Sequence, residues 1–172
     1  MSENKALIVI DMQNDYLWEK RKPVFSYDTN SLVRAVNDTI AEYSSKGWEI
    51  IYILQLFPDI ITNRWFIGFS IKNTEGAELY KGLNIVSDHI FEKNLPDTFT
   101  SKAFREFVAK QGYDEIALCG LDECGCVGAT AKGGIKAGLR VSLIEEATGR
   151  RFAAEKVSKT REKLKALGVK YI

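Results

Sequence analysis

Three residues with chemically active side chains, Asp11, Lys93 and Cys126, each follow a predicted β-strand. Asp11 comes directly after an unbroken apolar run, and Lys93 comes two residues after a weaker strand. Cys126 lies just past another strand, at the start of the next predicted helix. Because ligands of parallel sheets bind at the edge where the carboxyl ends of the strands meet, we expect a carboxylate, an ammonium and a thiol to gather there.

This trio is suited to nucleophilic catalysis by the thiol of Cys126. Cysteine attacks as the thiolate, its ordinary pKa is about 8.5, and both a helix N-terminus and a nearby lysine favour the charged form. Asp11 can take the thiol proton and later return it to a leaving amine. Backbone N–H groups in the turn 120–126 can bind the oxyanion of a tetrahedral intermediate. The chemistry therefore needs no histidine.

The composition predicts one ordinary domain, residues 1–172. Of 172 residues, 45% are hydrophobic and 27% are charged, and a chain of this length is typical of a single domain with its own core. The 24 basic and 23 acidic residues leave a net charge of +1. This balance gives no electrostatic attraction to nucleic acid or to a membrane surface, so we expect neither as a partner.

The histidine and cysteine content limits the kinds of site. The sequence has 1 His, His89, so a zinc site built on paired histidines is excluded within one chain. Its 3 Cys are crowded between positions 119 and 126, which is not a disulfide framework and fits a reducing compartment. With no signal-peptide pattern and no apolar run long enough to span a bilayer, we expect a cytoplasmic protein without a cofactor.

Predicted strands and helices alternate almost throughout the chain. The strands are expected at 5–10, 48–54, 87–91, 115–119, 139–144 and 169–172, and the helices at 28–46, 101–111, 126–137 and 152–167. This alternation predicts an α/β fold of three layers (α/β/α), Rossmann-like, around a mostly parallel six-stranded sheet. Residues 56–76 show no clear period, which is typical of a functional lid or a subunit contact.

Four segments resemble the isochorismatase-like cysteine hydrolases, the family that includes nicotinamidases and related amidohydrolases. They are residues 6–16 (ALIVIDMQNDY), residues 74–79 (TEGAEL), Glu92-Lys93 with Phe99, and residues 120–131 (GLDECGCVGATA). They occur in the family's order and span most of the chain. The first and last segments are specific for the family when they occur together. The resemblance implies the isochorismatase-like hydrolase fold.

The resemblance also implies roles for particular residues. Asp11 is then the general base, Lys93 the activating cation and Cys126 the nucleophile of a catalytic triad. The peptide bond between Leu121 and Asp122 is expected to be cis, with the backbone amides of Asp122 and Cys126 forming the oxyanion hole. The resemblance further implies a small-molecule substrate, a thioester intermediate and a homo-oligomer.

The sequence departs from the nicotinamidase pattern at the metal site. Nicotinamidases carry an Asp-x-His metal motif after the second strand, whereas this chain reads Gln-Leu-Phe-Pro at 55–58. A metal-dependent enzyme is therefore disfavoured. The Thr-Asp that often precedes the nucleophile is Glu123-Cys124 here, and the following helix carries Gly133-Gly134, which costs about 1 kcal/mol per glycine relative to alanine.

Four further residues are expected at a substrate pocket: Gln13, Trp65, Phe99 and Cys124. Each has a second interpretation. Gln13 can organise the first loop, Trp65 can belong to the core or a subunit contact, and Phe99 can be core. Cys124 can be a neutral residue at the pocket rim or a resolving thiol for oxidised Cys126.

The main hypothesis is a metal-independent cysteine hydrolase of a small non-peptide amide or related C–N bond, acting through a thioester. One alternative is a catalytically inactive family member that serves as a binding or scaffold protein. Another is a thiol redox sensor that uses Cys124 and Cys126. An unusually reactive Cys126 at neutral pH is expected of the enzyme, and an inert one of the scaffold.

Overall fold

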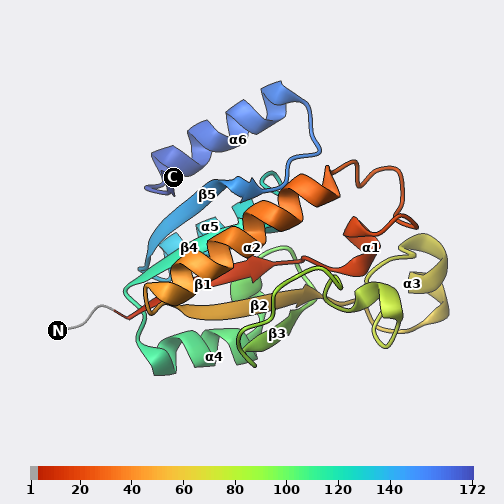
Figure 1. Ribbon diagram of the computed structural model, residues 1–172, viewed down its shortest axis with the longest axis horizontal. Helices are drawn as coiled ribbons and strands as arrows, with labels where there is room; N and C mark the ends of the chain where they lie inside the picture. Colours follow the sequence, from red (N-terminus) through yellow and green to blue (C-terminus); the bar gives the residue numbers. More distant parts are fainter. Residues whose placement is uncertain (1–3) are drawn as a thin grey trace.

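The computed structural model describes residues 4–172 and contains one six-stranded sheet with the strand order β3-β2-β1-β4-β5-β6 (Figure 1). The strands are β1 (Lys5–Ile10), β2 (Glu49–Gln55), β3 (Ile90–Lys93), β4 (Glu115–Gly120), β5 (Arg140–Thr148) and β6 (Lys170–Tyr171). Every neighbouring pair is parallel. The predicted α/β fold is confirmed, and the sheet is parallel throughout rather than mostly so.

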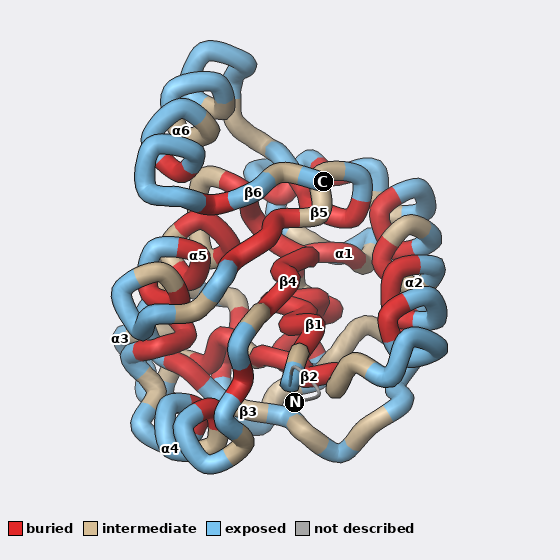
Figure 2. The backbone as a smooth tube through the Cα atoms, turned by 90° about the vertical axis from the view of Figure 1, so that its left-hand side faces the viewer, coloured by how far each residue is buried: buried red, intermediate tan, exposed pale blue. Residues whose placement is uncertain are grey.

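Helices cover both faces of this sheet. They are α1 (Asn14–Leu17), α2 (Thr29–Ser45), α3 (Ile61–Phe66), α4 (Lys102–Gln111), α5 (Cys126–Lys136) and α6 (Ala154–Ala166), with short 3₁₀ turns η1 (Glu75–Ala77) and η2 (Thr98–Thr100). In Figure 2 the sheet is seen from its end, with α2 on one side and α4, α5 and α6 on the other. The three predicted layers are therefore present.

Strand β1 shows why an unbroken apolar run belongs at the centre of such a sheet. Leu7 and Val9 pack into the core beneath α2, whereas Ala6, Ile8 and Ile10 pack into the core on the opposite face. All five residues are fully buried. A strand with a core on each face needs apolar side chains at consecutive positions, because neither face is open to water.

Two glycines in α5 let this helix approach its neighbours closely. A Cβ atom on Gly133 would lie 2.3 Å from Oδ1 of Asp97. A Cβ atom on Gly134 would lie 2.9 Å from side-chain atoms of both Ile116 and Val141. A larger residue at either position would therefore clash. The two glycines have a conformational cost, but they allow α5 to pack closely against the sheet and the segment before η2.

Three segments differ from the sequence-based boundaries in ways that bear on the site. Strand β3 lies two to three residues later than expected, so Lys93 is its last residue rather than a residue beyond it. Strand β5 continues four residues further, to Thr148. The aperiodic segment 56–76 contains the short helix α3. Over residues 4–172, no helix has the length and apolar character needed to cross a membrane.

Candidate active site

Asp11 lies where the strand order of the sheet reverses. β1 is flanked by β2 on one side and β4 on the other, and the chain builds outward from this centre in both directions. Asp11 follows β1 with φ of 54°, and its backbone N–H donates to the carbonyl of Ile53 at 3.0 Å. Ligands of open parallel sheets bind in the crevice outside this reversal point. The carboxylate therefore stands at the position where a ligand is expected.

Lys93 reaches Asp11 across the intervening strand. Its Cα is in register with that of Gln55 on β2. From there the ammonium Nζ donates to Oε1 of Gln55 at 2.6 Å and to Oδ2 of Asp11 at 3.0 Å. The Lys93 side chain has no exposed surface. An amide and a carboxylate thus compensate a fully buried cation.

Cys126 completes the trio. It is the first residue of α5, and its thiol lies close enough to the side chains of Asp11 and Lys93 for both to shift its pKa. Asp11 and Cys126 both line a cavity of about 370 Å³ that is open to solvent. The sequence placed these three residues at one edge of the sheet, and the structure brings their side chains together there.

The cavity walls are mainly aromatic and apolar, with a few polar groups. The remaining lining residues are Tyr16, Phe25, Tyr27, Gln55, Phe57, Phe69, Asn94, Leu95, Pro96, Leu121, Asp122, Gly125 and Arg151. The ring of Phe69 lies in edge contact with those of Tyr16, Phe25 and Phe57, at centroid distances of 5.8, 5.1 and 5.9 Å. This is the composition of a small-molecule pocket.

The turn before Cys126 is organised by the Asp122 carboxylate. The peptide bond between Leu121 and Asp122 is cis. Oδ1 of Asp122 accepts from the backbone N–H of Cys124 at 2.9 Å, and Oδ2 accepts from the hydroxyl of Tyr27 at 3.2 Å and the backbone N–H of Arg151 at 3.0 Å. Within the described chain, the backbone N–H groups of Asp122 and Cys126 donate to no protein acceptor. Both are available to an oxygen of a bound ligand.

Burial holds the Cys126 thiol in its protonated form. Burial and the adjacent Asp11 raise the pKa of Cys126 to about 12, and the ammonium of Lys93 opposes them only in part. At neutral pH the protonated thiol is therefore favoured, and Asp11 is the group placed to take its proton. Lys93 does act in the expected direction, but the loss of water around the sulfur outweighs it.

The other two members of the trio are shifted in the same direction. Burial raises the pKa of the Asp11 carboxyl above its ordinary value, although Lys93 opposes this. Burial alone would lower the pKa of Lys93, but its anionic neighbour Asp11 raises it overall. The buried ammonium of Lys93 thus lies beside two groups that can each lose a proton, Asp11 and Cys126. The favourable state is the one in which one of them is ionised and the other keeps its proton.

Glu123 has a structural role beside the nucleophile. Its side chain is fully buried and accepts from Nε and Nη2 of Arg161 on α6 at 2.6 and 3.1 Å. Arg150 lies 3.8 Å from the same carboxylate, and Arg161 also pairs with Glu145 at 2.8 Å. The departure from the family pattern at this position is accommodated by an ion-pair network that ties α6 to the turn before Cys126.

The four expected pocket residues lie away from the cavity. The side-chain amide of Gln13 binds backbone groups, because its Nε2 donates to the carbonyls of Gln55 and Ala77 at 3.0 and 2.8 Å. Trp65 on α3 is 79% exposed, and Phe99 is buried in the core beneath α4 and α5. Cys124 lines a separate hollow with residues of α5 and α6. For Gln13 the structure therefore favours the second interpretation, organisation of the first loop. For Phe99 it favours core packing.

Gln55, Asn94 and Arg151 are polar residues of the cavity that sequence reasoning missed. Gln55 is the last residue of β2, and Arg151 comes three residues after β5 ends. Both therefore lie at the same edge of the sheet as Asp11. The rule that selected Asp11, applied to the strand predicted at 48–54, would have found Gln55. It would not have found Arg151, because the fifth strand was expected to end at residue 144 and ends at Thr148.

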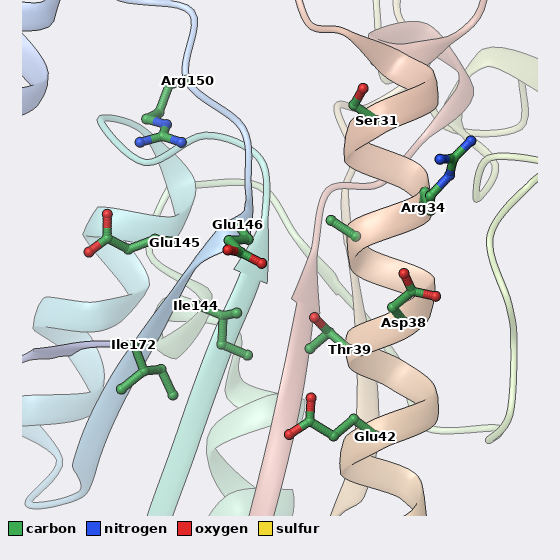
Figure 3. Close-up of a pocket in the computed structure, with 11 residues that line it drawn as sticks. Ser31, Arg34, Asp38, Thr39, Glu42, Ile144, Glu145, Glu146, Arg150 and Ile172 are labelled. Atoms are coloured by element: carbon green, nitrogen blue, oxygen red, sulfur yellow. The ribbon is translucent and has the colours of Figure 1, made fainter.

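A larger hollow of about 720 Å³ lies elsewhere, between α2 and the end of β5 (Figure 3). Charged side chains of both signs, among them Arg34, Asp38, Glu146 and Arg150, line it. None of the three trio residues does. Its size alone therefore does not make it the reactive site.

Comparisons with known proteins agree with the fold. An uncharacterized isochorismatase family protein of Bacillus subtilis, YddQ, is 23% identical over 145 residues, covering 83% of this chain and 76% of that protein. A probable inactive nicotinamidase of Arabidopsis thaliana is 27% identical over 139 residues, covering 74% and 70%. The crystal structure of a pyrazinamidase of Pyrococcus horikoshii in complex with zinc has a TM-score of 0.84 at 24% identity, covering 98% of each chain.

The zinc in that pyrazinamidase structure has no matching set of ligands here. Residues 4–172 contain no group of three or more His, Cys, Asp or Glu side chains arranged to hold a metal ion. The last residue of β2 is Gln55, whose Oε1 already accepts from Lys93. The residues present do not fit a resident metal.

The family itself is established by the sequence. The family model described as the isochorismatase domain matches residues 5–171, which is nearly the whole chain. The matched range includes all six strands and the three residues at the reactive edge of the sheet. The chain belongs to the isochorismatase domain family.

Proposed function

We propose that this protein is a metal-independent cysteine hydrolase that cleaves a small non-peptide amide or related C–N bond through a thioester. The observation that carries the proposal is the buried contact of Asp11, Lys93 and Cys126 at the edge of an aromatic cavity. Membership of the isochorismatase domain family supports hydrolysis, as does the likeness to a pyrazinamidase.

In the first step, Sγ of Cys126 attacks the carbonyl carbon of the substrate while its proton passes to Asp11. Burial raises the pKa of Asp11, which makes its carboxylate a stronger base than that of an ordinary aspartate. The carbonyl oxygen becomes an oxyanion that accepts from the backbone N–H groups of Asp122 and Cys126. Lys93 stays charged and stabilises the anion shared by Asp11 and Cys126.

In the second step, the tetrahedral intermediate collapses and the C–N bond breaks. Asp11 returns its proton to the leaving nitrogen, which departs as ammonia or an amine, and the acyl group stays on Cys126 as a thioester. A water molecule then attacks the thioester carbonyl while Asp11 removes its proton. The products are the carboxylic acid and the regenerated thiol.

A panel of small amides tests the proposal by release of ammonia or amine. We expect at least one amide to be turned over by the wild-type chain and by Cys124→Ala, but not by Cys126→Ala. Turnover that survives Cys126→Ala would reject the cysteine mechanism. Binding of amides without any turnover would instead support a catalytically inactive family member that serves as a binding protein. The Arabidopsis relative is described as a probable inactive nicotinamidase. A Cys124–Cys126 disulfide after mild peroxide treatment would support a redox sensor.

We further propose that copies of this chain associate. Helix α3 and the residue before it present Ile60, Ile61, Trp65 and Phe66, whose exposed fractions run from 52 to 85%. An apolar surface of this kind is unfavourable in water and is commonly buried between subunits. Sedimentation of the wild-type chain beside Trp65→Ser/Phe66→Ser tests this, since the proposal predicts a smaller species for the double variant.

A further inference from the structure

Arg151 differs from the two other arginines near the end of β5 in lacking a carboxylate partner. Arg150 and Arg161 both pair with the buried Glu123. Within residues 4–172, the guanidinium of Arg151 forms no ion pair. It lines the cavity that contains Asp11 and Cys126, and it is the only lysine or arginine among the residues that form this cavity wall.

The backbone and side chain of Arg151 are both held in place. Its N–H donates to Oδ2 of Asp122 at 3.0 Å, which fixes its Cα beside the turn that carries the nucleophile. Its Cζ lies 4.3 Å from the ring centroid of Phe152 and 5.7 Å from that of Phe25 on the cavity wall. Stacking on these rings orients the planar guanidinium, which also interacts with the Tyr27 hydroxyl. A guanidinium has five N–H donors, so others remain for a ligand.

The charges around Arg151 leave its cation without full compensation. The carboxylate of Asp122 interacts with Arg151, but it also accepts hydrogen bonds from Tyr27 and from the backbone N–H groups of Cys124 and Arg151. Lys156 adds a second cation on the far side of Phe152, with Nζ 3.5 Å from the ring centroid. The rim near Arg151 is therefore suited to an anion.

We propose that the substrate is a carboxylate-bearing amide, and that Arg151 binds the carboxylate at the end of the molecule remote from the bond that is cleaved. This inference rests on the proposed hydrolase function. The guanidinium matches a carboxylate in planar, two-bond geometry. The rings of Phe25, Phe57 and Phe69 then contact the apolar body between the two ends. The amide carbonyl lies at Cys126, and Arg151 selects the substrate without touching the reacting atoms.

The test uses pairs of amides that differ only in the remote charge. One pair is 4-carbamoylbenzoate and its methyl ester, and a second is succinamate and its methyl ester. For the wild-type chain we expect kcat/KM to be about tenfold or more higher for the acid of at least one pair, through KM. Arg151→Gln removes that preference. Arg150→Gln, which alters a neighbour facing the other hollow in Figure 3, keeps it.

Binding to the Cys126→Ala chain decides the inference independently of turnover. By titration calorimetry, the favoured acid should bind about tenfold more tightly than its ester, and Arg151→Gln in the same background should abolish the difference. Equal binding of acid and ester in both pairs, or a preference that survives Arg151→Gln, would overturn the inference. If selective binding is found but no amide is turned over, the proposed hydrolase fails while Arg151 remains the carboxylate site.

Discussion

Nζ of Lys93 lies 3.0 Å from Oδ2 of Asp11, although the two residues are 82 positions apart and β2 lies between their strands. Lys93 spans this strand because its Cα pairs with that of Gln55, the last residue of β2. The ion pair has almost no exposed surface. Solvent therefore screens the electrostatic effect of this ion pair on Cys126 only weakly. Removing Asp11 and removing Lys93 should shift the pKa of Cys126 in opposite directions.

Replacing Asp11 with Asn should separate thiol reactivity from catalysis. The Asp11 carboxylate raises the pKa of Cys126, so its removal should lower that pKa and leave Lys93 to favour the thiolate. At pH 8 we expect Asp11→Asn to be alkylated by iodoacetamide faster at Cys126 than the wild-type chain. Turnover should fall by about 10²-fold or more, since the proton acceptor is lost.

Replacing Lys93 with Met should have the opposite effect on alkylation. Lys93 lowers the pKa of Cys126, so without it the thiol should be alkylated more slowly than in the wild-type chain. All three cysteines lie on the tryptic peptide 111–132, so fragmentation of that peptide in the mass spectrometer assigns the label to Cys126 rather than to Cys119 or Cys124. If both substitutions change the alkylation rate in the same direction, the charge relationship described for the trio does not hold.

The pH dependence of kcat/KM should report the shifted pKa of Asp11. The base must be ionised, and burial raises its pKa above that of an ordinary aspartate. Activity is therefore expected to fall, as the pH is lowered, at a higher pH than an ordinary aspartate would give. Lys93→Met should move this acid limb further upward in any residual activity, because the ammonium lowers the pKa of Asp11.

A surface lysine provides the control for that shift. Lys72 pairs with Glu92 at 2.8 Å, and both side chains are about half exposed. Lys72→Met removes the same charge from the surface, where solvent screens it. Its acid limb should coincide with that of the wild-type chain. An equal shift in both variants would assign the effect to net charge rather than to the buried pair.

Much of the architecture follows from local patterns in the sequence. The run from Ala6 to Ile10 predicts a strand buried on both faces, and the structure places it at the centre of the sheet. Asp11, Lys93 and Cys126 were found because the end of a parallel strand fixes where the next residues lie. One sequence located these ends to within a few residues, since β3 lies two to three residues later than expected and β5 ends four residues further along.

The cavity wall and the thiol pKa depend on packing between distant segments. Trp65 belongs to a helix that turns its aromatic side chains outward, whereas Phe25, from the first loop, forms part of the wall. The pKa of Cys126 depends on how much water is excluded from the sulfur, which no spacing of residues records. The role of Glu123 likewise depends on Arg161, 38 positions away.

The Glu123–Arg161 pair should contribute strongly to stability. Arg161→Ala would leave a fully buried carboxylate with only Arg150, at 3.8 Å, as a cationic partner. We expect the free energy of unfolding to fall by about 3 kcal/mol in urea denaturation. Lys159→Ala on the same helix breaks an exposed pair with Glu155 and should cost less than about 0.5 kcal/mol. If both variants lose the same free energy of unfolding, burial of Glu123 does not determine how much the Arg161 substitution destabilises the protein.

The central claim is that Cys126 carries the acyl group during turnover, and trapping that group tests it most directly. The wild-type chain, quenched in acid during turnover of an amide substrate, should gain the mass of the acyl group in intact mass spectrometry. Peptide mapping should place it on Cys126, and hydroxylamine should release it as the hydroxamate. Cys119→Ala and Cys124→Ala should give the same adduct, and Cys126→Ala should give none. Turnover with no adduct at Cys126, or with an adduct on another residue, would contradict the account.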